Sequence, residues 1–243
     1  KLAPDAVVVY NLPKVAAELR RRKIPTIGPT HMSMLLEDDR MYAIRIVKQY
    51  AVGVVPETKR FNKVEDAAAF AKAQGGRKRW VFKAEGTTVD TNTTHVTESH
   101  EHLMAVLDFE GRLNRAKSFV LQEHIDGVEI SIEGWFDYRQ DDPWVHPCNS
   151  TLERKKLFAG DLGPMTGCMG SLVWEWPQER PKLFRQTLEN MTAWLKSAEY
   201  IGPIDGNFII DYKEHKPYFI EFSPRLGWNA FEALMAMHGV NWL

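Results

Sequence analysis

Runs of apolar and polar residues divide the first part of the chain into short elements. DAVVV at residues 5–9 is an apolar run typical of a buried strand, 13–23 has the spacing of a helix, and 24–28 is predicted to be a second strand. This order is the smallest parallel α/β unit, which needs further strands to make a domain. We therefore expect residues 1–30 to be the C-terminal part of an α/β domain, and the chain to begin inside that domain.

The rest of the chain alternates predicted helices with pairs of strands. Helices are predicted at 34–50, 64–74, 98–110, 180–199 and 230–239, and a strand at 79–86. Residues 118–137 are expected to form a hairpin around Asp126–Gly127, and 207–212 to pair with 217–222. Residues 145–176, with four glycines between 160 and 170, are predicted to be irregular. The pattern predicts a mixed α/β or α+β fold with antiparallel hairpins after an α/β start.

Composition narrows the class of protein. With 243 residues, 44% of them hydrophobic, the chain can bury a core as one large domain or two small ones. Its 31 basic and 32 acidic residues argue against nucleic-acid binding, and no apolar run approaches the length of a membrane helix. We expect no signal peptide, since the first residues lack a basic region followed by a long apolar one, and Cys148 and Cys168 alone cannot make a disulfide framework. We expect a cytoplasmic protein without nucleic-acid or membrane partners; its oligomeric state stays open.

Several motifs follow one another in an order that resembles the ATP-grasp superfamily. FKAEG, which contains Lys83, precedes LQEHIDGVE at 121–129 and FIEFSPRLG at 219–227. GDLGPMTGCMG at 160–170 is the most specific stretch, and with it the chain is similar to phosphoribosylamine–glycine ligases of purine biosynthesis over nearly its whole length. The resemblance implies an ATP-grasp domain of two α+β lobes at 31–243, with a small lobe at about 50–117 and a large lobe at about 118–243. It also implies that this domain follows the end of a Rossmann-like N-terminal domain, and that the chain is truncated at both ends.

The same resemblance implies an activity. The expected reaction is ATP-dependent ligation of a carboxylic acid and an amine, both small molecules, through an acyl phosphate. ATP and Mg²⁺ or Mn²⁺ are the implied cofactors. Such catalysis consists mostly of positioning and charge neutralisation, so the site needs cations and metal-binding carboxylates.

Nucleotide binding is assigned by the resemblance to Arg40, Lys83, Gln122, Glu123, Ile125 and Glu129. Lys83, and Arg40 in place of a family lysine, are expected to contact phosphate, since both side chains are cationic. The stretch 122–125 is expected to hold adenine, and Glu129 the ribose hydroxyls. The alternatives are ordinary surface roles: a lysine at a strand end, an arginine on a solvated helix face, and glutamates of a hairpin turned to water.

Glu221 is the strongest candidate for a metal ligand. It lies inside the apolar run PYFIEF, where an unpaired charge would be costly, and carboxylate oxygen suits magnesium. Ser223 and Asn207, or Asp205 in place of Asn207, are the further ligands expected. A structural ion pair of Glu221, for example with Arg225, is the alternative. Arg225 itself is expected to neutralise the transferring phosphoryl group or the acyl phosphate.

Substrate contacts are expected around the glycine-rich stretch. The catalytic set joins Lys155 and Asp161 to Arg225, and the substrate-binding set comprises Lys156, Gly163, Thr166, Gly167 and Trp228. Lys155 and Lys156 match a basic pair of the family that would bind substrate phosphate. The alternative is that ERKK at 153–156 is a solvated charged loop.

Two departures from the family bear on turnover and on substrate. The stretch TTVDTNTTHV at 87–96 has neither the glycine nor the lysine of the family's phosphate loop, and Asp90 would repel phosphate. Ser223 replaces an asparagine ligand, and Trp228 replaces an acid, so glycine is expected to be a poor substrate. One alternative is therefore an ATP-grasp protein that binds a nucleotide or a partner without turnover, and another is an enzyme of a different fold.

Overall fold

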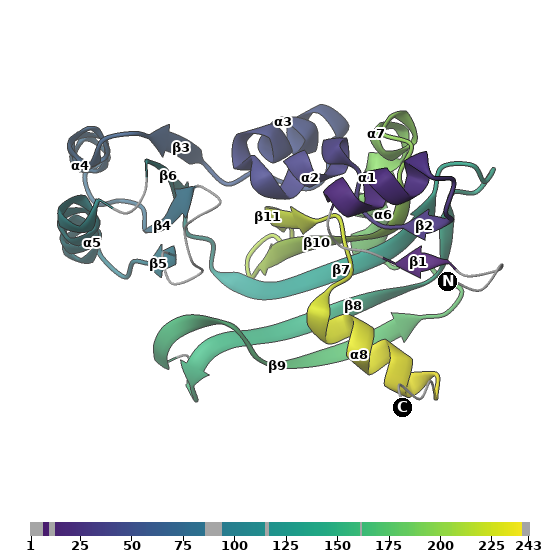
Figure 1. Cartoon of the computed structure of the whole chain (residues 1–243). Helices are drawn as coiled ribbons and strands as arrows, with labels where there is room; N and C mark the ends of the chain where they lie inside the picture. Colours follow the sequence, from purple (N-terminus) through teal and green to yellow (C-terminus); the bar gives the residue numbers. More distant parts are fainter. Residues whose placement is uncertain (1–6, 10–12, 86–93, 115–116, 161, 240–243) are drawn as a thin grey trace. The chain divides into compact units, whose positions relative to one another are not determined.

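The computed structural model describes residues 7–9, 13–85, 94–114, 117–160 and 162–239 (Figure 1). The chain divides into two compact units. Unit one comprises residues 1–54, 127–153 and 171–243, and unit two comprises residues 55–126 and 154–170. None of the helices in the described part is both long enough and apolar enough to cross a lipid bilayer.

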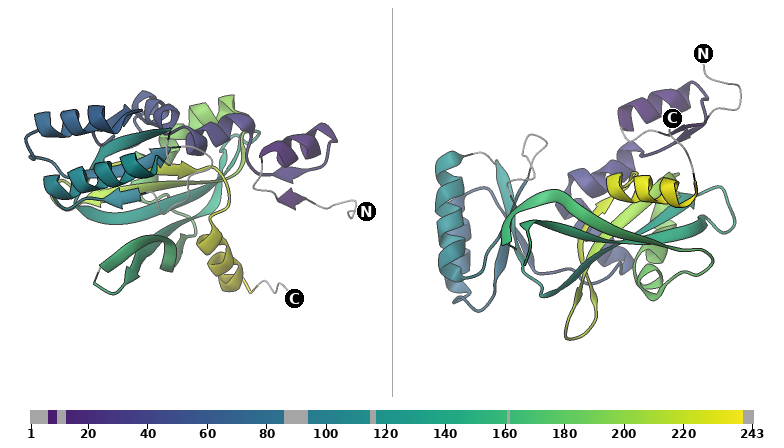
Figure 2. Two further views of the ribbon diagram at one scale, coloured as in Figure 1. Left: turned by 60° about the vertical axis from the view of Figure 1, so that its left-hand side comes forward. Right: turned by 90° about the horizontal axis from the view of Figure 1, so that it is seen from below.

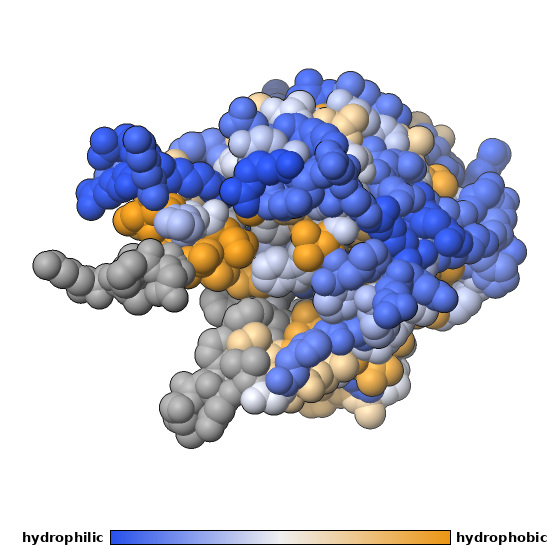
Figure 3. Space-filling view, turned by 90° about the vertical axis from the view of Figure 1, so that its right-hand side faces the viewer, coloured by the Kyte–Doolittle hydropathy of each residue, from blue (hydrophilic) through white to orange (hydrophobic). Residues whose placement is uncertain are grey.

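Unit one begins with the predicted strand–helix–strand. Strand β1 (Val8–Val9) pairs in parallel with β2 (Thr26–Ile27), and α1 (Pro13–Arg21) connects them. Arg20 donates hydrogen bonds to the carbonyl oxygens of Gly28 and Pro29, at 2.6 and 3.0 Å, which tie the helix to the segment after β2. Val7, Val9 and Val15 are 53, 44 and 37% exposed. Figure 3 views this end of the molecule, where apolar area interrupts a largely hydrophilic surface.

The single helix predicted at 34–50 is wrong, because the structure has two. Helix α2 (His31–Asp38) starts earlier, where Thr30 and Ser33 form a reciprocal capping box. Helix α3 (Arg40–Tyr50) starts anew because Asp39 has extended backbone angles, and its carboxylate accepts from the Tyr42 N–H at 3.0 Å. An aspartate that caps a helix in this way interrupts an otherwise helical pattern of apolar residues. Both helices pack against the last strand of the sheet.

Five strands form the main sheet in the order β11–β10–β7–β8–β9. Their bounds are β7 (Gly127–Asp137), β8 (Trp144–Phe158), β9 (Leu162–Trp176), β10 (Ile201–Asp211) and β11 (Pro217–Ser223). The antiparallel pairing predicted for the last two strands is confirmed. The irregular structure predicted at 145–176 is wrong, because β8 and β9 form a long hairpin (Figure 2). Much of β9 is exposed on both faces, so its sequence shows no alternation of apolar and polar residues.

The hairpin predicted around Asp126–Gly127 is also wrong. The strand before it, β6 (Ser118–Glu123), pairs with β3 and β4, whereas β7 pairs with β10 and β8. The dipeptide therefore joins two different sheets. Glycine is required at 127 because a Cβ there would lie 2.3 Å from the carbonyl oxygen of Ile210. The glycine permits a close backbone approach and not the tight turn that the sequence predicted.

A β-bulge changes which faces of β11 are polar. Asn207 of β10 is paired with Glu221, but the next residue, Phe208, is paired with Phe219, so Ile220 is the extra residue. Phe219 and Phe222 are fully buried, whereas Glu221 is partly exposed. The inserted residue therefore lets an apolar core face and a polar face coexist on one short strand.

The helix predicted at 180–199 is three short pieces. They are α6 (Lys182–Gln186), the 3₁₀ helix η2 (Leu188–Met191) and α7 (Thr192–Ser197). The break falls at Thr187, whose backbone is not helical and whose hydroxyl donates to the Leu183 carbonyl oxygen at 2.6 Å. The last helix of the described chain is α8 (Trp228–Met237), close to the predicted last helix.

Unit two contains a four-stranded sheet in the order β3–β6–β4–β5. Its elements besides β6 are β3 (Thr58–Phe61), α4 (Val64–Ala73), β4 (Trp80–Glu85), β5 (Thr94–Val96) and α5 (His100–Leu113). Phe82 and Phe119 stack at a centroid distance of 4.7 Å within a core that also takes in residues of α4 and α5. Because side chains alternate along a strand, the neighbouring residues Lys83 and Val120 lie on the opposite face.

Candidate active site

Polar side chains cross one face of the five-stranded sheet in unit one. Residues directly opposite each other on neighbouring strands share a face, so the strand register defines two rows. The first row is Ser223, Asp205, Glu133 and Asn149, and the second row is Glu221, Asn207, Ser131 and Thr151. The candidate metal ligands Glu221 and Asn207 are therefore direct neighbours, with Ser223 in the adjacent row.

The two carboxyl groups of the first row, Glu133 and Asp205, have raised pKa values. Glu133 is 2% exposed, and its Oε2 accepts from the Gly227 N–H at 3.3 Å. Burial raises the pKa of Glu133 to about 7. Burial also raises the pKa of Asp205 well above its usual range, and the nearby charges of Glu133, Glu153 and Glu221 add to this rise. Carboxylates that repel one another in this way are stabilised by a bound cation.

Arg225 lies beside this face but is paired with Glu37 of α2. Its Nε donates to both carboxylate oxygens at 3.1 and 2.9 Å, and its Nη2 donates at 2.6 Å. Burial lowers the pKa of Arg225, but the Glu37 hydrogen bonds outweigh it, with further help from the charges of Glu221 and Asp205, so the pKa is raised. The arginine therefore keeps its charge next to the two polar rows.

Arg40 and Glu129 also belong to unit one. Arg40 is the first residue of α3, and its Nη1 donates to the carbonyl oxygen of Ile220, the bulge residue, at 3.3 Å. Glu129 lies two residues before Ser131 on β7, and so is on the face of the polar rows. Arg40 thus contacts the strand that carries Glu221, and Glu129 shares a sheet face with Glu221.

Lys83 and Gln122 are hydrogen-bonded to each other in unit two. The Nζ of Lys83 donates to Oε1 of Gln122 at 2.8 Å, and Nε2 of Gln122 donates to the Thr58 hydroxyl at 3.2 Å. Lys83 is 9% and Gln122 2% exposed, so the alternative of an ordinary surface lysine is wrong. A primary amide holds the ammonium group in one place without carrying a charge itself.

The candidate adenine-binding stretch, residues 122–125, covers the end of β6 and the residues directly after it. Glu123 ends β6 and forms an ion pair with Lys78 at 3.1 Å, while Lys78 also contacts Glu57 at 2.8 Å. The Glu57 hydrogen bond, and then that of Glu123, raise the pKa of Lys78. Ile125 lies beyond the end of the strand and is partly buried. In this structure the carboxylate expected to contact adenine is engaged with a lysine.

The glycine-rich candidates lie at the end of the β8–β9 hairpin. The hydroxyl of Thr166 donates to the Lys155 carbonyl oxygen at 2.7 Å, and Nζ of Lys156 donates to the Gly163 carbonyl oxygen at 3.3 Å. Both lysines are on strand β8, so the solvated-loop alternative is wrong about the local structure. Gly167 is exposed on β9. Asp161, the segment 86–93 and the side chain of Trp228 lie outside the described residues.

Sequence reasoning missed the members of both rows that lie on β7 and β8, which are Glu133, Asn149, Ser131 and Thr151. Glu129, Ser131 and Glu133 occupy every second position of β7, but only the first was singled out. This polar alternation inside an apolar strand was the available signal. Asn149 and Thr151 carried no signal, because their stretch was predicted to be irregular. Among the described residues, no group of three or more His, Cys, Asp and Glu is arranged to hold a metal ion.

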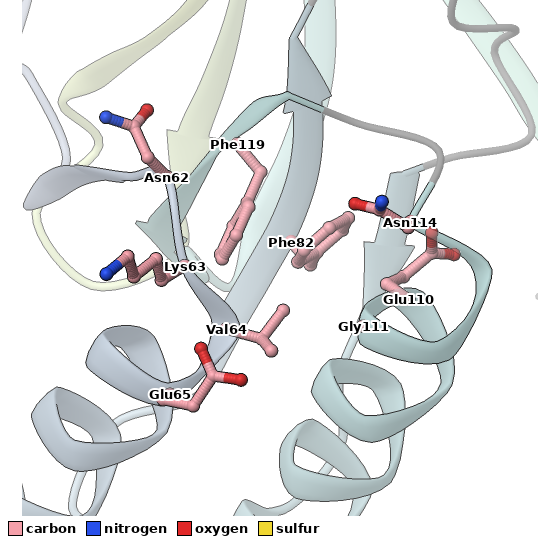
Figure 4. A pocket seen from close by; sticks show the side chains of 9 residues that line it. All are labelled: Asn62, Lys63, Val64, Glu65, Phe82, Glu110, Gly111, Asn114 and Phe119. Carbon is pink, nitrogen blue, oxygen red and sulfur yellow. The ribbon is translucent and has the colours of Figure 1, made fainter.

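A separate cavity of about 180 Å³ lies on the helix side of the sheet in unit two (Figure 4). Phe82 and Phe119 line it from the sheet, Val64 from α4, and Glu110 and Asn114 from the end of α5. Lys83 and Gln122 do not line it. Lys83 and Gln122 are therefore on the other face of this sheet.

The fold is shared with a ligase of known structure. A crystal structure of phosphoribosylamine–glycine ligase from Thermotoga maritima superposes with a TM-score of 0.66 at 23% identity, over 93% of this chain and 56% of that one. The class of protein is ATP-grasp, because more than half of the chain matches the model of an ATP-grasp domain.

Sequence comparison identifies the family. Residues 38–229 match the model described as phosphoribosylglycinamide synthetase, ATP-grasp (A) domain, and the chain belongs to this family. Phosphoribosylamine–glycine ligase from Leifsonia xyli subsp. xyli is 30% identical over 232 residues, which are 93% of this chain and 52% of the relative. The enzyme of the same name from Methanosarcina barkeri is 25% identical over 222 residues, 88% of this chain and 49% of the relative. The chain spans about half the length of these curated relatives.

Proposed function

We propose that the protein is an ATP-dependent carboxylate–amine ligase that acts through an acyl phosphate. The observation that carries this proposal is the side-by-side placement of Glu221 and Asn207 on a sheet face rich in carboxylates. The names of the relatives, phosphoribosylamine–glycine ligase, support a reaction of this kind in purine biosynthesis.

The proposed roles divide between the two units. Lys83, positioned by Gln122, and Arg40 bind phosphate oxygens, Glu123 and Ile125 contact adenine, and Glu129 binds ribose. Glu221, Asn207 and Ser223 would hold Mg²⁺ or Mn²⁺, since carboxylate, amide and hydroxyl oxygens suit these ions. The ion supplies charge neutralisation at the phosphates of ATP.

Arg225 neutralises the acyl phosphate in this proposal, and Glu37 keeps its guanidinium in place. Lys155 and Asp161 complete the proposed catalytic set, and Lys156, Gly163, Thr166, Gly167 and Trp228 contact the substrates. Both substrates are small molecules, an amine and a carboxylic acid. We further propose a cytoplasmic protein in which residues 1–30 end an α/β domain and 31–243 form the ATP-grasp domain.

A second candidate is an ATP-grasp protein that binds a nucleotide without turnover. The absence of glycine and lysine from TTVDTNTTHV at 87–96 favours it, because such residues close over phosphates.

One experiment separates the two candidates. The full-length protein is incubated with ATP, Mg²⁺, phosphoribosylamine and a panel of amino acids, and ADP release is measured. A ligase sustains ADP release over many turnovers only when both an acid and an amine are present, because the amine must consume the acyl phosphate formed with the first ADP. ATP binding without ADP release on any combination would favour the second candidate.

A further inference from the structure

Two cationic side chains lie in one row across three neighbouring strands of the sheet in unit two. Arg60 of β3 and Lys83 of β4 are each directly opposite Val120 of β6. Residues that are directly opposite each other on neighbouring strands share a face of the sheet. The backbones of β3 and β4 are two strand spacings apart, about 9–10 Å, so both long side chains can reach the space between them. Arg60 is therefore on the face that carries Lys83 and Gln122.

Contacts with the two neighbouring strands hold the guanidinium group of Arg60 over this face. Its Nε forms an ion pair with Oε2 of Glu85 on β4 at 2.6 Å, and its Nη2 donates to the hydroxyl of Ser118 on β6 at 3.2 Å. Glu85 and Ser118 are directly opposite each other. A guanidinium group has five N–H donors, and neither contact uses Nη1. The arginine can therefore bind an anion without giving up the contacts that hold it.

The guanidinium group lies far from the candidate adenine-binding stretch. That stretch begins at Gln122, whereas Ser118, which Arg60 contacts, is four residues earlier on β6. Four residues of a strand span about 13 Å. Lys83 lies between these two positions, because it is opposite Val120. A nucleotide with its base at residues 122–125 and a phosphate at Lys83 would thus extend its farthest phosphates toward Arg60.

The sequence after β4 supplies no cation for those phosphates. Residues 86–93 contain no lysine or arginine and one acidic residue, Asp90. Arginine suits this role because its planar guanidinium group binds phosphate through two parallel hydrogen bonds. Glu85 offsets the charge of Arg60, so directed hydrogen bonds, more than net charge, are what the arginine contributes.

We propose that Arg60 binds the phosphates of ATP that are farthest from the base, and that Glu85 and Ser118 position its guanidinium group. This assignment rests on the proposed function, since it adds a phosphate contact to the same nucleotide site. The alternative is an ion pair with a structural role only. The side chains of Arg60 and Glu85 are 51 and 13% exposed, and an ion pair of this kind contributes little to stability.

The preceding residue provides a matched control. Lys59 is an exposed cation on the same strand, but side chains alternate, so it points to the opposite face. Its Nζ lies 4.5 Å from the ring centroid of Phe70 and 5.7 Å from that of Phe61. Replacing either Lys59 or Arg60 by methionine changes the net charge of the protein by the same amount. Only the change at Arg60 affects the face of Lys83.

Calorimetric titration of the full-length protein with ATP and with AMP, both in the presence of Mg²⁺, tests the proposal. Arg60→Met should weaken ATP binding at least tenfold and leave AMP affinity within twofold of the wild type, because AMP lacks the farthest phosphates. Lys59→Met should bind both nucleotides normally. Salt screens charged contacts, so the ATP affinity of the wild type should fall as salt is added. It should fall less steeply in Arg60→Met, and as steeply as in the wild type in Lys59→Met.

A double variant separates phosphate binding from effects on folding. Arg60→Gln combined with Glu85→Gln removes both charges, so the net charge is kept and neither partner is left alone. Circular dichroism establishes that the variant is folded. It should still bind ATP at least fivefold more weakly than the wild type, because the guanidinium group is gone. Wild-type ATP affinity in this variant would overturn the proposal.

The proposal is also overturned if Arg60→Met binds ATP as tightly as the wild type, or if its affinities for ATP and AMP fall by the same factor. Turnover is measured separately. A wild type that binds ATP but releases no ADP with any substrate would contradict the proposed ligase, whereas weaker ATP binding by Arg60→Met would still support the phosphate contact. A wild type that does not bind ATP would overturn both.

Discussion

Arg225 donates hydrogen bonds to both carboxylate oxygens of Glu37, at N–O distances of 2.6 and 2.9 Å. The pair joins helix α2 to the segment after β11, and its side chains are only 23 and 27% exposed. A bidentate arginine–carboxylate pair has a fixed geometry. The guanidinium is therefore held in one position beside the polar rows before any ligand arrives.

We expect this pair to contribute more to stability than a surface ion pair. A double-mutant cycle of Glu37→Gln and Arg225→Gln should give a coupling free energy of about 1–2 kcal/mol, because the groups are partly buried and doubly hydrogen-bonded. The measurement is urea denaturation. The exposed pair Arg112–Asp108 is the control, and should couple by about 0.3–0.5 kcal/mol. Equal couplings would show that the Arg225 pair contributes no more than an exposed one.

Lys83→Met should lower ATP affinity at least tenfold while the protein stays folded. Methionine fills a similar volume but cannot neutralise phosphate. The measurement is ATP titration by calorimetry, with circular dichroism as the test of folding. Lys72→Met, on the exposed side of α4, is the matched control and should bind ATP normally. Normal ATP binding by Lys83→Met would remove this lysine from the nucleotide site.

Glu221→Gln should reduce ADP release to background without unfolding the protein. The amide keeps the shape of the side chain but cannot balance a divalent cation. ADP release is measured over a range of Mg²⁺ concentrations, with Glu214→Gln as a control on the exposed β10–β11 turn. Turnover near the wild-type level at saturating Mg²⁺ would argue against a metal-binding role.

Glu133 should make the free energy of unfolding depend on pH in a defined window. Its pKa is raised from 4.5 to about 7 in the folded state, so the folded protein binds more protons than the unfolded chain between these values. Stability should therefore fall as pH rises from about 4.5 to 7, by about 3 kcal/mol for this group, and level off above 7.

Urea denaturation at pH 5 and pH 8, without divalent cations, measures this effect. Glu133→Gln should lose this part of the pH dependence and be more stable than the wild type at pH 8. If the two proteins differ equally at both pH values, the carboxylate titrates normally in the folded state.

The sequence predicted the individual helices and strands better than it predicted which strands pair with each other. The strand–helix–strand at the start and the pairing of β10 with β11 depend on local spacing and were found. The partner of β6 was not, because Asp126–Gly127 has the composition of a tight turn while Gly127 instead permits contact with Ile210. Helix breaks at Asp39 and Thr187 depend on side-chain capping and local hydrogen bonds that apolar periodicity does not reveal.

The candidate site shows a similar division. Motif resemblance singled out Lys83 and Glu221, whose immediate neighbours in sequence are distinctive. The contacts of Lys83 with Gln122, and of Arg225 with Glu37, join residues 39 and 188 positions apart, and no local pattern encodes them. Asn149 and Thr151 became visible only once β8 was seen to run beside β7.

The extra residue Ile220 makes the number of residues in β11 as important as their identity. Side chains alternate with a period of two along a strand, yet Phe219 and Glu221 face opposite sides because Ile220 interrupts the count. Deletion of Ile220 alone would leave every candidate functional residue in the protein. It would nevertheless turn the carboxylate at 221 toward the aromatic core, or turn the phenylalanine out of it. A substitution at position 220 would keep this strand register, whereas a deletion or insertion would shift it.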